Sequence, residues 1–446
     1  MANSADTVHS TLSRREIIIG WVVGIVFLVL FLGFPTYRYN HDGVGCARFL
    51  DEYAMAKGTI FYPTEPRENV ALAPGRDVDD PENLGARQTQ AGWWVIWNPH
   101  HLLYVPVTAV FFRMFRHLGA DIGGMGFLQV WNSIASAITL LLLYRLCASV
   151  LKGSQYVLPW TLFLGFSATF FHYATDGAQY PTPVLFMTIA AGNIWLFSSD
   201  FQIRRLIRAG IWLALAVLFH QIVSLVVPIF SLAVYMRMRG ARKDDFAGSK
   251  WSAWLPFVFG IGIPVIFYLI IGAFALAPTG EFNLRGIIKY ATLYGQEKHF
   301  WATNPFYGFL TNLLTYIGFF FSNPRTFDAI FNNIPFTLYV MVLPSLWILT
   351  ALHAKKISHE MRWWAGFNAL WILPFLIFLS FWVPGNDFYH LFLSVPLTFL
   401  ALIGAESARR SGREGIRDLV FFWAWCVAGI FINFSFSLNQ SVRLIF

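Results

Sequence analysis

The sequence predicts an all-α polytopic membrane protein. Of its 446 residues, 57% are hydrophobic and only 13% are charged. Several uninterrupted apolar runs approach the roughly 20 residues that a helix needs to cross a bilayer core. Aromatic residues, which anchor helices at membrane interfaces, make up 18% of the chain. Three such apolar runs are Ile17–Pro35, Pro256–Pro278 and Val420–Phe436.

The net charge of +8 is mostly a matter of topology. More than half of the 32 Lys and Arg residues lie in short clusters, which are typical of cytoplasmic loops. No basic stripe with interleaved aromatic residues lies elsewhere, so nucleic acid is not an expected partner. The three cysteines are too scattered for a disulfide framework or a metal motif. The basic clusters are Arg14–Arg15, Arg145–Lys152, Arg204–Arg208, Arg237–Lys250, Lys355–Arg362 and Arg409–Arg417.

The N-terminal part is expected to begin in the cytoplasm. With Arg14–Arg15 inside, the first span emerges on the outer face near Tyr37, and a long polar outer loop follows over about residues 37–100. The apolar segment Leu102–Phe115 is too short for a comfortable crossing. We expect it to be a juxtamembrane helix along the outer interface, which returns Arg145–Lys152 to the inside.

A hairpin is expected between Arg208 and Arg237. Both residues are basic and should be inside, yet they are too close together for two full spans. Two short helices that enter from the inside satisfy both conditions, with an apex near His220–Gln221. Non-helical backbone at membrane depth is tolerated where it is buried in protein or lines a watery cavity. His220 is therefore a candidate functional residue, and a packing histidine is the alternative.

The remaining chain alternates outer segments and spans. The span Ala253–Leu276 leads to a second outer segment at residues 278–304, and Phe306–Phe321 is expected to be interfacial. The whole chain then has about eleven transmembrane helices. The last four expected spans are Phe336–Leu352, Trp363–Trp382, Phe388–Ala405 and Leu419–Phe436.

Two hydrophobic segments end in the same pattern, Tyr-x-x-Asp-Gly. The copies are Tyr39–Gly43 and Tyr173–Gly177. Each places a carboxylate, Asp42 or Asp176, at a membrane boundary, where an ionised side chain is costly and suggests function. The alternative is that Asp-Gly only marks a turn. The expected topology puts both acids on the outer face, so we expect them to share one site.

These features together resemble the GT-C glycosyltransferases, the membrane enzymes that use polyprenyl-phosphate sugars. The resemblance points to the protein O-mannosyltransferases and the bacterial aminoarabinose transferases. Asp42 stands where that family has its first-loop acid, and Phe171–Asp176 is similar to the segment with the second acid. Asn98–Tyr104 is similar to a His-Pro-Pro-Leu-like element. His220–Gln221, followed by Val226–Pro228, stands where relatives often carry Lys-Gly.

The sequence departs from the family pattern at three places. Asp42 is a lone acid where relatives often have adjacent acids, and His100–His101 replaces a Pro-Pro. His220 replaces a lysine, and a neutral histidine carries no charge for a phosphate.

The resemblance implies a catalytic module at residues 1–300, followed by further transmembrane helices at 301–446. A hexosyl or pentosyl group would move from a polyprenyl-phosphate donor to a lipid, glycan or protein acceptor at the outer face, with inversion. Asp42 is the candidate general base. Asp176 is a candidate ligand for Mg²⁺ or Mn²⁺, or Asp42 and Asp176 share the ion. Candidate substrate-binding residues are His100, His101, His220, Gln221, Arg285, Lys298 and His299; interfacial anchoring is the alternative for the bases of the second outer segment.

Two other interpretations remain at this point. A zinc site at His41 and His100–His101 is disfavoured because neighbouring histidines do not converge on one ion and no third ligand has suggestive spacing. A secondary transporter or lipid flippase is the alternative function. Such folds commonly have repeated halves and broken helices that meet at mid-membrane, whereas this chain has one candidate broken element and no visible repeat. The short loops favour a prokaryotic plasma membrane.

Overall fold

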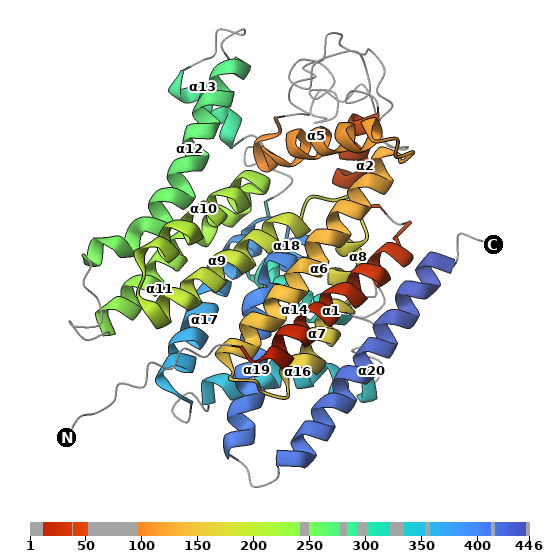
Figure 1. The fold of residues 1–446 in the computed structure, drawn as a ribbon, viewed down its shortest axis with the longest axis vertical. Helices are drawn as coiled ribbons and strands as arrows, with labels where there is room; N and C mark the ends of the chain where they lie inside the picture. The colour runs from red at the N-terminus through yellow and green to blue at the C-terminus, as the bar shows by residue number, and fades with distance from the viewer. Residues whose placement is uncertain are drawn as a thin grey trace.

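The computed structural model describes residues 12–37, 39–51, 97–240, 249–276, 283–292, 301–321, 334–352, 357–411 and 415–442. Within these ranges the regular elements are helices, and Trp301 and Trp382 form an isolated bridge. The predicted all-α class is confirmed for this part of the chain (Figure 1).

Nine helical segments of the described chain are long and apolar enough to cross a membrane, against about eleven expected. Two expected crossings are shorter: α10 has 17 residues, and α7 and α8 are a broken pair of 9 and 7 residues. Eight of these segments lie on the long helices α1 (Arg14–Gly33), α6 (Gly124–Val150), α9 (Pro181–Asp200), α12 (Leu255–Leu276), α16 (Ile334–Leu352), α17 (His359–Phe381), α19 (Ser394–Ser411) and α20 (Gly415–Val442). The ninth, Gln221–Gly240, joins η3 and α11. The shorter elements are α2 (His41–Phe49), η2 (Pro99–His101), α5 (Tyr104–His117), α7 (Val157–Gly165), α8 (Ala168–Ala174), α10 (Ile203–Phe219), η3 (Gln221–Leu225), α11 (Val227–Gly240), η5 (Lys250–Trp254), α13 (Leu284–Ala291), α14 (Pro305–Phe321), α18 (Asp387–His390) and η9 (Leu391–Leu393).

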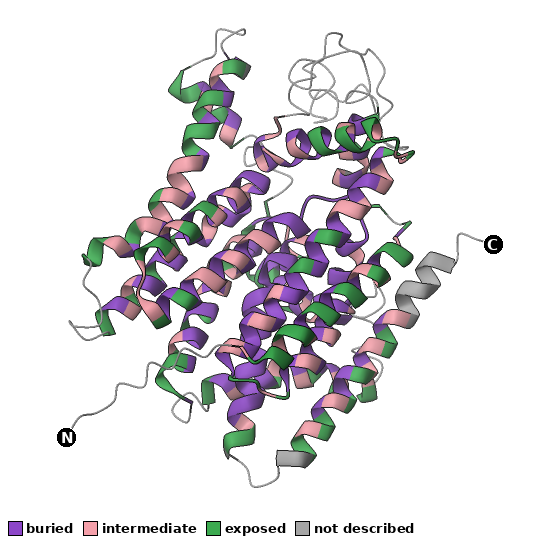
Figure 2. Ribbon diagram, in the orientation of Figure 1, coloured by how far each residue is buried: buried purple, intermediate pink, exposed green. Residues whose placement is uncertain are grey.

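The helices form a bundle whose outer surface is apolar. Buried residues gather in the middle of the bundle, while α1, α12 and α20 turn exposed residues outward (Figure 2). On α1, Phe27 and Phe31 are fully buried, whereas Trp21, Ile25 and Val29 are more than half exposed. An apolar helix with such an exposed face is suited to lipid, not to water. The chain is an integral membrane protein.

One hydrophobic core joins the two halves of the chain. Phe163 of α7 stacks on Phe320 of α14 with ring centroids 5.6 Å apart, and it contacts Trp425 of α20 at 4.8 Å. Trp160 also stacks on Trp425. Residues before and after position 300 therefore share this core, and the division of the chain at that position stays a prediction.

Helix α5 lies across one end of the bundle, at a large angle to α6 (Figure 1). Its inner face buries Tyr104, Ala109 and Phe112, while Phe111 and Met114 are exposed. This placement is the one expected for Leu102–Phe115. We refer to the end of the bundle that carries α2, η2 and α5 as the α5 end.

The expected helix break at His220 is present, although the second arm, Gln221–Gly240, is itself long enough to cross a membrane. Entry of the hairpin from the inside stays a prediction. Helix α10 ends at Phe219, His220 is extended (φ −158°, ψ 113°), and η3 and α11 follow. The two basic ends of the hairpin meet, because Arg237 at the end of α11 donates to the Ser198 carbonyl, 2.8 Å away. Ser198 lies near the end of α9, just before α10 begins. The apex is at the α5 end, where the Leu103 amide donates to the Leu218 carbonyl at 2.9 Å.

The expected interfacial placement of Phe306–Phe321 is wrong. Helix α14 covers this segment and runs into the bundle beside α17, and Phe319 and Phe320 are fully buried. Asn312 is buried as well: its side-chain amide donates to the Leu376 carbonyl at 3.0 Å, and its Oδ1 is 2.7 Å from His390 Nε2. Tertiary partners of this kind decide whether a short apolar helix lies on a bundle or inside it.

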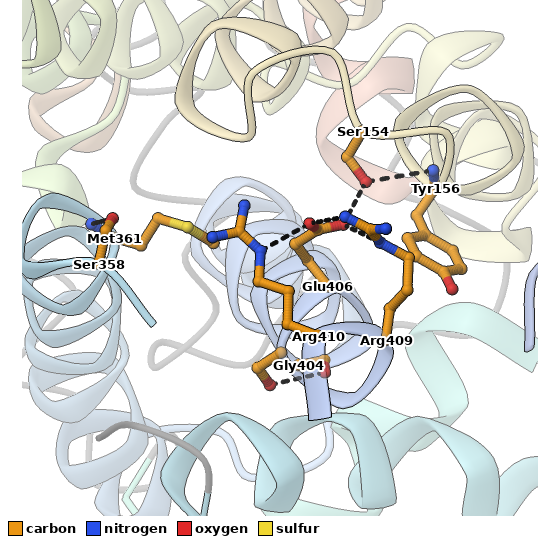
Figure 3. A network of polar contacts seen from close by, with 9 residues as sticks. Ser154, Tyr156, Ser358, Met361, Gly404, Glu406, Arg409 and Arg410 are labelled. Carbon is orange, nitrogen blue, oxygen red and sulfur yellow. Dashed lines mark hydrogen bonds and ion pairs between the residues drawn. The ribbon is translucent and has the colours of Figure 1, made fainter. Parts of the chain in front are cut away.

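The opposite end of the bundle carries several of the basic clusters. Arg145 reaches the Ile17 carbonyl in the first turn of α1, at 3.5 Å. Glu406 of α19 is buried and accepts from Ser154, which follows the cluster Arg145–Lys152, and from Arg409 and Arg410 (Figure 3). Three clusters that the sequence places on one side of the membrane therefore lie together.

Candidate active site

The two Tyr-x-x-Asp-Gly motifs pack against each other at the α5 end. The Asn40 amide donates to Asp176 Oδ2 at 3.0 Å, and the Thr36 amide donates to the Thr175 carbonyl at 3.3 Å. Gly43 lies so close to the second motif that a Cβ on it would be 2.9 Å from the Gly177 carbonyl carbon. Glycine is required here because only a missing side chain permits this approach. The two motifs, far apart in sequence, build one site.

Asp176 is the buried acid of the site. Its side chain has no exposed surface; Oδ1 accepts from the Gly177 amide at 2.7 Å, and Oδ2 accepts from Asn40. Burial raises the pKa of Asp176 to about 6, although the two amide bonds oppose this shift. Asn132 of α6 holds the same turn by donating to the Asp176 carbonyl at 2.7 Å. The carboxylate therefore fixes the loop that carries Asp42.

Asp42 is the more accessible acid. It is partly exposed and lies in the first turn of α2, where Asn40 caps the helix by accepting from the Asp42 amide at 2.9 Å. Its Oδ2 accepts from Tyr180 at 2.6 Å and from the Gln179 side chain at 3.1 Å. Two donors that follow the second motif therefore orient the carboxylate.

Three histidines gather beside these acids. His100 and His101 lie in η2, and His220 is the extended residue at the hairpin apex. The ring centroids of His101 and His220 are 4.6 Å apart, and His100 is 5.7 Å from His101 and 5.8 Å from His220. We call these three residues the histidine cluster. Gln179 joins it to Asp42, since its Nε2 is also 2.7 Å from His101 Nε2.

The two histidines of η2, His100 and His101, are uncharged at neutral pH because their pKa values are lowered. Burial lowers the pKa of both His100 and His101 to about 3. For His100, the neighbouring His101 lowers the pKa further, because two adjacent imidazolium ions repel each other. These rings can hydrogen-bond or ligate, but they do not neutralise a phosphate.

Helices α12 and α13 hold the histidine cluster in place. Tyr268 of α12 donates to the Pro99 carbonyl, and Tyr290 of α13 donates to the Trp97 carbonyl at 2.5 Å. The Gln221 side chain donates to the Ala291 carbonyl at 2.7 Å. Gln221 thus lies beside the cluster, as the sequence suggests, with its amide bonded to the backbone of α13.

The other predicted substrate-binding residues are not among the described residues that contact the two acids or the histidine cluster. Arg285 is exposed on α13. Lys298 and His299 lie outside the residues that the structure describes, as does the side chain of His41. Their roles stay predictions.

Sequence reasoning missed three residues of the site. Gln179 and Tyr180 directly follow the second Asp-Gly pair, and that adjacency was an available signal. Asp387 comes from α18 and accepts from Tyr173 at 3.3 Å. Its neighbour Phe388 stacks on Tyr180 with centroids 4.5 Å apart. Only the fold brings these C-terminal residues to the first two acids.

The contacts of Asp176 do not fit a divalent ion held between the two acids. Both of its oxygens accept backbone amides, and the side chain is inaccessible. Mg²⁺ usually keeps several waters in its coordination shell, which such burial does not accommodate. The predicted Mg²⁺ or Mn²⁺ site at Asp42 and Asp176 stays a prediction that these contacts do not favour.

Comparisons with known proteins identify the fold. No family model matches the sequence, and no curated protein matches it. Two solved structures of ArnT from Cupriavidus metallidurans are similar: the apo state, with a TM-score of 0.55 and 11% identity, and the form bound to undecaprenyl phosphate, with a TM-score of 0.53 and 13% identity. They cover 89% and 88% of this chain, which spans 60% of the length of each of them.

At this level of sequence identity the comparison establishes similarity of fold and nothing about activity. ArnT is an aminoarabinose transferase with the GT-C architecture, which is the architecture that the sequence resemblance implied. The chain accordingly shares the GT-C fold of these ArnT structures.

Proposed function

We propose that this protein is a membrane glycosyltransferase that moves a sugar from a polyprenyl-phosphate donor to an acceptor hydroxyl. The observation that carries the proposal is the convergence of the two Asp-Gly motifs and the histidine cluster at the α5 end. One of the similar ArnT structures is bound to undecaprenyl phosphate, which supports a lipid-phosphate donor here. The basic clusters at the opposite end of the bundle support an outer-face position for the α5 end.

Asp42 is the proposed general base. It is the accessible acid of the pair, and both Tyr180 and Gln179 orient it through Oδ2. The acceptor oxygen attacks the anomeric carbon and gives its proton to Asp42, while the bond from that carbon to the phosphate oxygen breaks. The polyprenyl phosphate leaves, and the configuration inverts. The acceptor is a lipid, a glycan or a protein.

Asp176 is the proposed positioning residue. It holds the Asn40 amide, and Asn40 in turn caps the helix that carries Asp42. The histidine cluster and Gln221 lie on the donor side of this arrangement. Arg285, Lys298 and His299 are proposed to meet the donor phosphate from the second outer segment.

Asp42→Asn tests the proposed base. We expect the variant to bind undecaprenyl phosphate as the wild type does, because the carboxylate acts on the acceptor. Sugar transfer should fall at least about 100-fold, as is typical when a general base is removed. Native mass spectrometry measures lipid binding, and release of labelled sugar from a panel of polyprenyl-phosphate donors measures transfer in membranes.

Asp121→Asn is the matched control for this experiment. Asp121 is a fully exposed acid at the same end of the bundle, paired with Arg116 at the surface. Full transfer by Asp42→Asn removes Asp42 from the mechanism. Lipid binding by the wild type with no sugar release from any donor would instead favour a lipid flippase.

A further inference from the structure

The histidine cluster has the composition and spacing of a transition-metal site. His100, His101 and His220 each offer one ring nitrogen, and these nitrogens lie within 4.8 Å of one another. Within the described part of the chain, no other group of three histidine, cysteine or acidic side chains meets this spacing. Zinc bonds imidazole nitrogen at 2.0–2.1 Å, so ligand nitrogens of a tetrahedral site lie about 3.4 Å apart. Metal binding therefore requires the three rings to turn toward one another.

One ring nitrogen of the cluster lacks a partner in the interior of the protein, and a second has only a poorly aligned one. His220 is fully buried, yet its Nε2 has no hydrogen-bond partner. His101 Nδ1 makes no hydrogen bond of good geometry, although the Phe219 backbone interacts with the His101 ring. Buried polar atoms are usually satisfied, so an unpaired buried nitrogen needs an explanation. The unpaired nitrogen of His220, on a ring whose centroid is 4.6 Å from that of His101, points to a ligand shared within the cluster.

We propose that His100, His101 and His220 bind one first-row transition-metal ion, with Zn²⁺ as the expected occupant. Three imidazoles suit Zn²⁺, Cu²⁺, Fe²⁺ and Ni²⁺, whereas Mg²⁺ and Ca²⁺ prefer oxygen ligands. The site is therefore distinct from the ion first expected at Asp42 and Asp176. Three protein ligands also leave one position of a tetrahedral ion open, as catalytic zinc sites do.

The neighbouring hydrogen bonds can accommodate the ion. When His220 ligates through Nε2, its proton moves to Nδ1, and the bond that Nδ1 accepts from the Ile222 amide is lost. That bond is long, at 3.3 Å. When His101 ligates through Nδ1, its ring gives up the interaction with the Phe219 backbone, and its Nε2 carries a proton. The Gln179 Oε1 can turn to accept that proton in exchange for the bond from Gln179 to Asp42, which keeps its bond from Tyr180. Such an acceptor behind the ligand is the usual outer-shell support of a metal-bound histidine.

The ion would supply a charge that the histidines lack. Neutral imidazole ligands leave a Zn²⁺ ion with its full positive charge, and a cation at this position would attract the phosphate of the donor. This last step rests on the proposed function, whereas metal binding itself does not.

Cobalt titration tests the metal site without reference to activity. The full chain, purified without a histidine tag and stripped with a chelator, is titrated with Co²⁺ while its visible absorption is recorded. We expect one saturable site with ligand-field bands, and zinc in the same ratio by mass spectrometry of the elements. Both signals should be lost in His101→Ala and in His220→Ala. They should be kept in His117→Ala, because His117 is an exposed histidine on α5.

The conservative variant His220→Asn guards against misfolding, and size-exclusion profiles must match the wild type. The proposal is wrong if the wild type shows no saturable cobalt binding. It is also wrong if cobalt binding survives in folded His101 and His220 variants. If cobalt does not bind but undecaprenyl phosphate does, only the metal site fails. If cobalt binds but no polyprenyl-phosphate lipid does, with or without zinc, the proposed function fails and the metal site stands.

Discussion

The two acids of the site have the same sequence motif and different environments. Asp42 is partly exposed and bonded to two side chains, whereas Asp176 is buried and bonded to two backbone amides. A carboxylate that exchanges protons with an acceptor needs access, and one that fixes backbone needs burial. Environment, not residue type, therefore separates their proposed roles.

The raised pKa of Asp176 predicts a specific pH dependence of stability. The carboxyl binds its proton more tightly in the folded chain (pKa about 6) than in an unfolded chain, where the pKa is about 4. Protonation therefore favours the folded state, and stability falls as the pH rises from about 4 through 6. The free energy of unfolding should fall by about 3 kcal/mol over this range, because each of the two pKa units corresponds to about 1.36 kcal/mol.

Thermal unfolding in detergent from pH 4 to pH 8 measures this effect. The difference in unfolding temperature between the wild type and Asp176→Asn should change across the window, since the amide does not titrate. Asp121→Asn, which replaces a fully exposed acid, is measured alongside as a control. A constant difference for Asp176→Asn would show that its pKa is not raised by folding.

At the scale of elements, the close approach of two helix ends depends on a glycine, which has no side chain. The start of α2 meets the turn before α9 through Gly43, and a Cβ there would lie 2.9 Å from both the Gly177 carbonyl carbon and the Ala178 amide nitrogen. Both of those atoms belong to backbone, which cannot move as the end of a flexible side chain can. The close packing of the two Asp-Gly motifs is therefore a property of the helix junction.

Gly43→Ala is expected to lower stability by about 2 kcal/mol, as overpacking does, and to reduce sugar transfer because Asp42 follows the displaced backbone. Gly45→Ala is the matched control: Gly45 is on the same helix, and a Cβ there meets no atom within 4 Å. Thermal unfolding and transfer assays on both variants check the prediction. Equal unfolding temperatures and equal transfer rates for the two variants would mean that a side chain fits between the two motifs.

At the other end of the bundle, Glu406 joins α19 to the loop after α6. Ser154 donates to Glu406 Oε2 at 2.9 Å, and Arg409 and Arg410 donate to the same carboxylate (Figure 3). Glu406→Ala should lower stability by about 2 kcal/mol, since hydrogen bonds to a charged group are lost and the half-exposed arginines are partly rescued by water.

Binding of undecaprenyl phosphate should be unchanged in folded Glu406→Ala, because the residue is far from the α5 end. Native mass spectrometry and thermal unfolding on one preparation separate the two effects. Impaired lipid binding without a loss of stability would place Glu406 in a functional role.

At the scale of the whole molecule, the C-terminal helices complete the site. Asp387 and Phe388 contact Tyr173 and Tyr180, which flank the second acid. The chain nevertheless spans only 60% of the length of the ArnT structures that share its fold. Helices of both halves thus contribute to the candidate active site.

The orientation in the membrane is testable by cysteine labelling. In a background without the natural cysteines, Gly45→Cys and Arg285→Cys should react with an impermeant reagent from outside, since both positions are exposed at or near the α5 end. Arg410→Cys should react only after the membrane is permeabilised. Labelling of Arg410→Cys in intact cells would invert the proposed topology and place the site in the cytoplasm.

The sequence by itself determined the membrane class, the interfacial α5, the hairpin at His220 and the common location of Asp42 and Asp176. Each follows from local composition: the length of an apolar run, the position of basic residues, or a repeated motif. The buried course of α14, the entry of Asp387 into the site and the gathering of His220 with His100 and His101 were decided by tertiary structure. Contacts such as Asn312 with Leu376 and Asp387 with Tyr173 join residues 64 and 214 positions apart. They arise only when helices pack, because no local pattern reveals the partners of side chains in the interior of a bundle.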